Sequence, residues 1–128
     1  SAAVSDWKLK NIEKEKIKKK DKFTISLEEN KDIIKHISNH NSLRPKLVIG
    51  FAAETNDITE NAKKKLAEKN CDWIIANDIS NRSIGFDSNF NEVSIFYKNK
   101  KFKDEKLEIK KKSEISEEIV DRVVEHLN

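Results

Sequence analysis

The sequence predicts an α/β domain built on an open β-sheet. A short apolar run at 47–49 is followed by Gly50, by small residues, and then by a helical pattern from Asp57 onward. A second buried run at 73–76 follows that helix, and an amphipathic helix is predicted over 113–128. In open α/β sheets, ligands bind beyond the carboxyl ends of the strands. We therefore expect a ligand site where the first buried strand turns into the helix.

Length and composition limit the class of protein. The chain has 128 residues, of which 36% are hydrophobic and 38% are charged, so one small domain with a modest core is expected. The single cysteine, Cys71, excludes an internal disulfide and fits the reducing cytoplasm, where we place the protein. The absence of a long apolar run predicts no membrane span. The net charge of +3 argues against a nucleic-acid binder.

The amino-terminal third combines a charged segment with two predicted elements. The lysine-dense segment 8–22 is interpreted either as a solvated charge run or as a cationic flap that closes over a polyanion. Alternation predicts a half-buried strand over 23–27, and apolar spacing predicts a helix of about three turns from Asp32. The pair His36 and His40 lacks a third ligand at matching spacing, which favours surface histidines over a metal site.

Polar residues follow both central strands. Residues 54–57 and 77–80 come directly after apolar runs, where α/β ligand sites lie. Asp57 and Glu60 match a capping box at the start of the following helix. On that helix Lys65 and Lys69 share one face, as two solvated lysines or as a pair that contacts phosphate.

The carboxyl-terminal half predicts a hairpin and a helix. Alternation over 92–97 and 106–110 predicts two antiparallel strands. In the last helix Ser116 is the expected cap, and the apolar face comprises Ile119, Val120, Val123, Val124 and Leu127. Cys71 has no nearby base, so buried packing is expected for it.

Several stretches together resemble a known family. They are Gly50-Phe-Ala-Ala-Glu-Thr-Asn56 and residues 2–7, 16–19, 30–33, 76–80 and 85–88. In this order they are similar to the carboxyl-terminal part of bacterial phosphopantothenoylcysteine synthetase, which is usually fused behind a flavin-dependent decarboxylase in coenzyme A biosynthesis.

The resemblance implies a fold and an activity. The fold would be a Rossmann-like three-layer open sheet that lacks its amino-terminal βαβ portion and carries a β-hairpin extension for dimerisation. Residues 1–128 would be the carboxyl-terminal portion of the ligase domain, with the flap at 8–22. The family uses CTP and Mg²⁺ to join 4′-phosphopantothenate to cysteine through an acyl-cytidylate. FMN would belong only to the missing decarboxylase domain, and the isolated chain is expected to be inactive.

The resemblance also implies roles for particular residues. Lys16 matches a catalytic flap lysine, and no metal ligand is indicated. The residues that match CTP contacts are Ala2, Asp6, Lys16, Lys31, Asp32, Ile33, Ile34, Phe51, Lys65 and Lys69. A homodimer is implied, with 23–27 and 92–110 as its candidate elements. The alternative is a non-catalytic, lysine-rich module that dimerises or binds anions.

Overall fold

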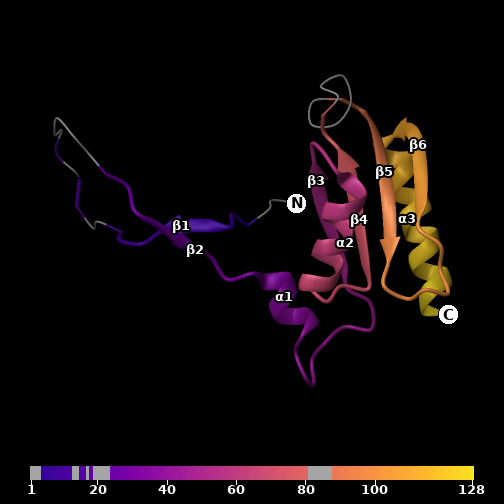
Figure 1. The fold of residues 1–128 in the computed structure, drawn as a ribbon, viewed down its shortest axis with the longest axis horizontal. Coiled ribbons are helices and arrows are strands. Elements are labelled where there is room, and N and C mark those ends of the chain that lie inside the picture. The colour runs from indigo at the N-terminus through magenta and orange to yellow at the C-terminus, as the bar shows by residue number, and fades with distance from the viewer. Residues whose placement is uncertain (1–3, 13–14, 17, 19–23, 81–87) are drawn as a thin grey trace. The chain divides into compact units, whose positions relative to one another are not determined.

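The computed structural model describes residues 4–12, 15–16, 18, 24–80 and 88–128 (Figure 1). The chain divides into two compact units, 1–33 and 34–128, and each is described by itself. The predictions for Ala2, for much of the 8–22 flap, for Phe23 and for the 81–87 loop lie outside the described residues.

The first unit contains one antiparallel strand pair. Strand β1 (Trp7–Leu9) pairs with β2 (Leu27–Glu29) so that Lys8 lies opposite Glu28. The Lys8 Nζ and Glu28 Oε1 atoms are 3.3 Å apart. All six strand residues are exposed. The prediction of a half-buried strand ending at residue 27 is therefore wrong: the strand begins at Leu27, and neither of its faces is covered within the described part of this unit.

The second unit is organised around a four-stranded mixed sheet. Its strands are β3 (Ile49–Glu54), β4 (Trp73–Asp78), β5 (Phe90–Tyr97) and β6 (Glu105–Lys111), in that spatial order. β3 and β4 are parallel, whereas β4, β5 and β6 form antiparallel pairs. The predicted α/β class and the predicted hairpin are confirmed.

Strand β3 extends through residues that were predicted to form a turn. Gly50, Ala52 and Glu54 are buried, whereas Phe51 and Ala53 are exposed, which is the alternation of a strand. A Cβ atom placed on Gly50 would lie 2.6 Å from Ile74 Cδ1. The glycine thus allows β3 to lie close to the Ile74 side chain of β4, and the turn follows only after Glu54.

The two longer helices cover opposite faces of this sheet. Neighbouring residues of a strand point to opposite faces. Accordingly Ile74 belongs to the core cluster that includes Ala62 and Leu66 of α2 (Ile58–Glu68). Ile75 belongs to the cluster that includes Ile115 of α3 (Lys112–Leu127). The buried packing predicted for Cys71 is confirmed. The short helix α1 (Ile33–Ser38) adds Ile34 to the α2 side.

Helix α3 begins differently from the prediction. It starts at Lys112, and the Lys111 N–H donates to Glu114 Oε2 at 2.9 Å. Ser116 lies inside the helix, where its hydroxyl donates to the Ser113 carbonyl at 2.7 Å. The predicted cap at Ser116 is therefore wrong, because a glutamate three residues after Lys111 satisfies the first amide instead.

The apolar face of α3 is only partly buried. Ile119 and Val123 pack against the sheet, whereas Val120, Val124 and Leu127 are at least half exposed. The sheet covers Ile115, Ile119 and Val123, which follow one another at intervals of four residues. The predicted apolar face is wider than this stripe. The remaining apolar side chains lie on its flank.

An ion cluster joins α3 to the hairpin, and it predicts acid sensitivity. Arg122 Nη2 lies 2.8 Å from Glu105 Oε2, and the Tyr97 hydroxyl also donates to Glu105. These hydrogen bonds, that of Arg122 foremost, lower the pKa of Glu105. Because the pKa of Glu105 is lowered in the folded state, its ionised carboxylate stabilises the fold at pH values above the ordinary pKa of a glutamate. This stabilisation is lost as the pH falls through the folded-state pKa.

We expect Arg122→Met to reduce the difference in unfolding free energy between pH 7 and pH 3 by about 1 kcal/mol. Urea unfolding at the two pH values measures it, with Lys103→Met as the control that removes an exposed cation. An unchanged pH dependence in Arg122→Met would contradict the stated role of the ion cluster.

Candidate functional site

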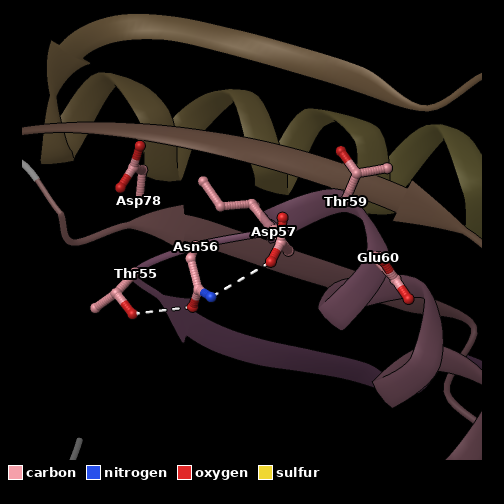
Figure 2. A pocket seen from close by; sticks show the side chains of 7 residues that line it. Thr55, Asn56, Asp57, Thr59, Glu60 and Asp78 are labelled. Carbon is pink, nitrogen blue, oxygen red and sulfur yellow. Dashed lines mark hydrogen bonds between the residues drawn. The ribbon is translucent and has the colours of Figure 1, made fainter.

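A cavity of about 510 Å³ opens where β3 and β4 end (Figure 2). Because these strands are parallel, with Glu54 opposite Asp78, both carboxyl ends meet at one edge of the sheet. The lining residues come from the β3–α2 connection, the first turn of α2 and the last residue of β4: Thr55, Asn56, Asp57, Ile58, Thr59, Glu60 and Asp78. Polar residues therefore lie at the carboxyl ends of both strands, as the sequence predicts, and they meet at this edge.

The connection from β3 to α2 turns sharply at Asp57. This residue has a φ of 45° and lies in the left-handed region. Its side chain accepts from Asn56 Nδ2 at 3.3 Å (Figure 2), and no side-chain hydrogen bond caps α2 among the described residues. The predicted capping box of Asp57 and Glu60 is therefore wrong, since the left-handed turn points the aspartate back along the connection. Within the described residues, the Asp57 side chain therefore leaves the first amides of α2 uncapped at the cavity wall.

The cavity is negatively charged. Asp57, Glu60 and Asp78 line it, and no lysine or arginine does so in the described ranges. Asp78 Oδ1 accepts from the Ser80 hydroxyl at 2.6 Å and from the Ser80 amide at 2.8 Å. These hydrogen bonds lower the pKa of Asp78, so its carboxylate is charged at neutral pH. Such a wall accepts hydrogen bonds from hydroxyl, amide or amine groups and repels phosphate.

The lysines of α2 do not line this cavity. Lys65 Nζ lies 2.7 Å from Oε1 of Glu54, whose side chain is only 9% exposed. Lys69 follows the last residue of α2, at the helix end opposite the cavity, about 16 Å along the axis. Lys65 therefore neutralises the buried carboxylate of Glu54.

The other predicted site residues are distributed over both units. Asp6 and Lys16 are exposed in the first unit, where the Asp6 carbonyl accepts from the Asn30 amide at 2.7 Å. Lys31, Asp32 and Ile33 also belong to the first unit. In the second unit Ile34 packs on the core and Phe51 is 73% exposed on β3, outside the cavity. Since the units are described separately, this set remains a prediction.

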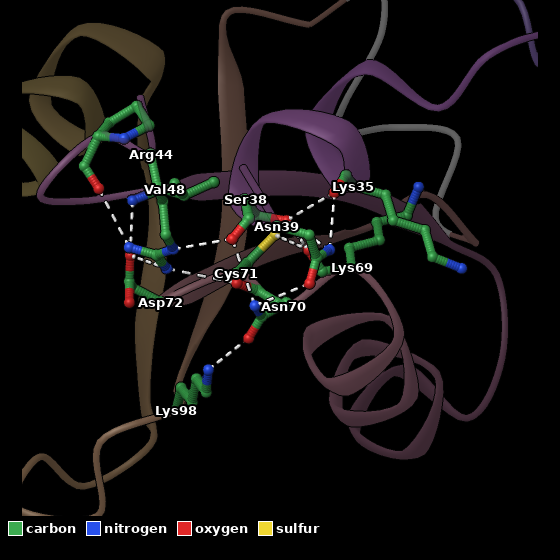
Figure 3. A network of polar contacts seen from close by, with 11 residues as sticks. Lys35, Ser38, Asn39, Arg44, Val48, Lys69, Asn70, Cys71, Asp72 and Lys98 are labelled. Carbon is green, nitrogen blue, oxygen red and sulfur yellow. Dashed lines mark hydrogen bonds and ion pairs between the residues drawn. The ribbon is translucent and has the colours of Figure 1, made fainter. Parts of the chain in front are cut away.

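A second polar cluster lies at the opposite end of β4 and supports the fold (Figure 3). Asp72 Oδ2 accepts from Arg44 Nη2 at 2.9 Å and from the Val48 amide at 2.7 Å. Arg44 Nε donates to the Ser38 carbonyl at 2.9 Å, and the Ser38 hydroxyl donates to the Lys69 carbonyl. The cluster ties α1 and the segment before β3 to the start of β4.

No group of three or more potential metal ligands occurs among the residues that the structure describes. The rings of His36 and His40 meet edge to face, with centroids 6.1 Å apart. Within the described ranges, no helix is long and apolar enough to cross a membrane.

The fold and cavity define an α/β domain with a polar site at the carboxyl ends of two parallel strands. A family model described as "DNA/pantothenate metabolism flavoprotein C-terminal domain" matches residues 1–127, and the chain belongs to this family.

Characterised relatives and solved structures agree with the family. The chain is 38% identical over 125 residues to the coenzyme A biosynthesis bifunctional protein CoaBC of Haemophilus influenzae, covering 97% of this chain. It is also 38% identical over 124 residues to the Bacillus subtilis protein of the same name, covering 96% of this chain. It spans 30% of the length of each. A crystal structure of the C-terminal domain of CoaBC matches with a TM-score of 0.70 and 32% identity, over 98% of this chain and 52% of that one.

A more distant structure shows the fold alone. The DNA/pantothenate metabolism flavoprotein from Streptococcus pneumoniae matches with a TM-score of 0.61 and 21% identity. The match covers 80% of this chain and 42% of that chain.

These findings correct the assignment made from sequence motifs. The family is described as a flavoprotein's C-terminal domain, and the matching proteins as bifunctional proteins of coenzyme A biosynthesis. None of these descriptions names a synthetase, a ligase, CTP or Mg²⁺. The labels of phosphopantothenoylcysteine synthetase and CTP-dependent ligase are therefore withdrawn, as is the alternative of a lysine-rich anion-binding module.

The cofactor assignment is corrected on the same finding. The family is described as a flavoprotein domain. This description contradicts the assignment of CTP and Mg²⁺ to this chain and of FMN only to another domain. The physical reason for the error lies in the motif. Gly50 packs closely against Ile74, and Ala52 is buried beneath α2. The small residues of the motif are therefore explained by packing within the fold and do not by themselves indicate a nucleotide site.

Proposed function

We propose that this chain acts in coenzyme A biosynthesis as part of a longer protein. The support is the family match over residues 1–127 and the relatives named for that biosynthesis. The sheet would then form part of a larger Rossmann-type sheet. Its amino-terminal βαβ portion would lie elsewhere in the longer protein, and the cytoplasm is its proposed location.

We further propose that the cavity at the ends of β3 and β4 binds a metabolite derived from pantothenate. Pantothenate carries hydroxyl groups and an amide, and these donors match the carboxylates of Asp57, Glu60 and Asp78. The amide and hydroxyl oxygens of the ligand match the uncapped amides at the start of α2. The proposal rests on one observation: carboxylate acceptors and helix amide donors lie together at the edge of the sheet where β3 and β4 end.

Calorimetric titration tests the proposed ligand. Pantothenol, the neutral alcohol, is expected to bind about threefold to fivefold more tightly than pantothenate, whose carboxylate meets the charged wall. Asp78→Asn should reduce this preference, whereas Glu117→Gln, on the exposed surface of α3, should leave it unchanged. FMN and CTP serve as comparison ligands because both carry phosphate. Binding of either that depends on Asp78, in the absence of pantothenol binding, would contradict the proposal.

A homodimer is also proposed. Val120, Val124 and Leu127 present an apolar flank on α3, which a second copy of the chain could cover. Light scattering after size-exclusion chromatography is expected to give twice the chain mass of 14.9 kDa. A monomeric mass at about 100 μM protein would contradict it, since a stable interface binds well below that concentration.

A further inference from the structure

A second cavity, of about 400 Å³, lies at the end of the sheet opposite the polar site. It is lined by Trp73 at the start of β4 and by Tyr97 at the end of β5, which are cross-strand partners. The other lining residues are Phe102, Glu105, Asp121, Arg122 and Glu125. The wall therefore combines three aromatic rings with three carboxylates and one guanidinium.

The aromatic part of the wall is held in place by ring contacts. Tyr97 packs edge to face on Trp73 with centroids 5.2 Å apart, and Phe102 lies 5.4 Å from Tyr97. Trp73 and Tyr97 are at least 96% buried, whereas Phe102 is 42% exposed. His126 fills the space behind, 5.3 Å from Trp73 and 5.5 Å from Phe102. Phe102 is thus a fixed ring with an accessible surface.

The charged part of the wall favours a cation over an anion. Arg122 directs Nε and Nη2 to Glu105 and Nη1 to the Glu118 carbonyl and carboxylate, which occupies most of its donors. Glu105 is neutralised by that contact. Asp121 and Glu125 stand one turn apart on the exposed side of α3 and add negative charge at the rim.

We propose that this cavity binds an organic cation, an amine or ammonium group carried on an apolar body. The positive group would lie between the carboxylates of Asp121 and Glu125, and the apolar body against Phe102. The Phe102 ring packs against the apolar body, and the two carboxylates make a direct charge contact with the cation. The site is separate from the polar cavity and does not depend on the function proposed for that cavity.

Chemical-shift titration of the 128-residue chain tests this proposal with four related aromatic probes. Benzylamine supplies the cation, benzyl alcohol the neutral form and benzoate the anion, while benzyltrimethylammonium separates amine from quaternary ammonium recognition. We expect benzylamine or benzyltrimethylammonium to shift the amides around Phe102 and Glu125 with millimolar affinity, and benzoate to leave them unchanged. Equal binding of benzylamine and benzyl alcohol would overturn the proposal, as would the absence of any shift.

Variants locate the two halves of the site. Phe102→Leu should weaken benzylamine binding about fivefold, since a contact between two aromatic rings contributes about 1 kcal/mol beyond the area it buries. Asp121→Asn combined with Glu125→Gln should weaken it by about tenfold. The matched control Glu117→Gln removes a carboxylate from the same helix outside the cavity and should have no effect. Equal weakening by the control would show general charge attraction and overturn the assigned site.

Discussion

Replacement of Asp72 by alanine is expected to lower the free energy of unfolding by about 3 kcal/mol. The carboxylate accepts from Arg44 and from the Val48 amide, both at hydrogen-bond distance (Figure 3). Both donors would lose their acceptor, and the segment before β3 would lose its attachment to the start of β4. Urea unfolding followed by circular dichroism measures the change.

Two further variants make the Asp72 result specific. Asp72→Asn retains an oxygen acceptor for Val48 and should cost about half as much. Asp121→Ala removes an exposed carboxylate from α3 and should change stability by less than about 0.5 kcal/mol. A cost for Asp72→Ala no larger than that of Asp121→Ala would show that the cluster does not support the fold.

Replacement of Gly50 by alanine is expected to cost about 2–3 kcal/mol, the upper part of the range for overpacking a core. The added Cβ would lie 2.6 Å from Ile74 Cδ1 and 3.3 Å from Cys71 Sγ. Ile74 is 1% exposed, so its methyl group has little space into which to move. Thermal unfolding by calorimetry gives the value.

The same strand supplies the control for Gly50. Ala53 is exposed on β3, and Ala53→Val should be neutral within about 0.5 kcal/mol. If Gly50→Ala is as stable as the parent chain, the close approach of β3 and β4 is not a packing constraint. Restoration of stability by Ile74→Val in the Gly50→Ala background would identify the clashing atom.

Sequence patterns predicted the elements whose signals are local. The apolar runs before residues 54 and 77, the helix after Asp57 and the alternation of the hairpin each mark one element, and each is present. The polar residues that follow the two parallel strands also located the cavity edge. These predictions succeeded because strand and helix periodicities are set by the chain itself.

Relations between distant residues leave no local signal in the sequence. The packing partner of Gly50, Ile74, lies on another strand. The ion pair of Lys65 with Glu54, a residue that precedes the helix, is visible only in three dimensions. The aromatic cavity joins β4, β5 and α3, which no local pattern connects.

We propose above that the carboxyl ends of β3 and β4 form a site for the neutral, hydroxyl-bearing part of a metabolite derived from pantothenate. The most direct measurement is a backbone amide chemical-shift titration of the full 128-residue chain with pantothenol. We expect the largest shifts at Ile58, Thr59 and Glu60, with smaller shifts at Asp78 and none at Phe102. Shifts confined to other parts of the chain, or no shifts at saturating pantothenol, would contradict it.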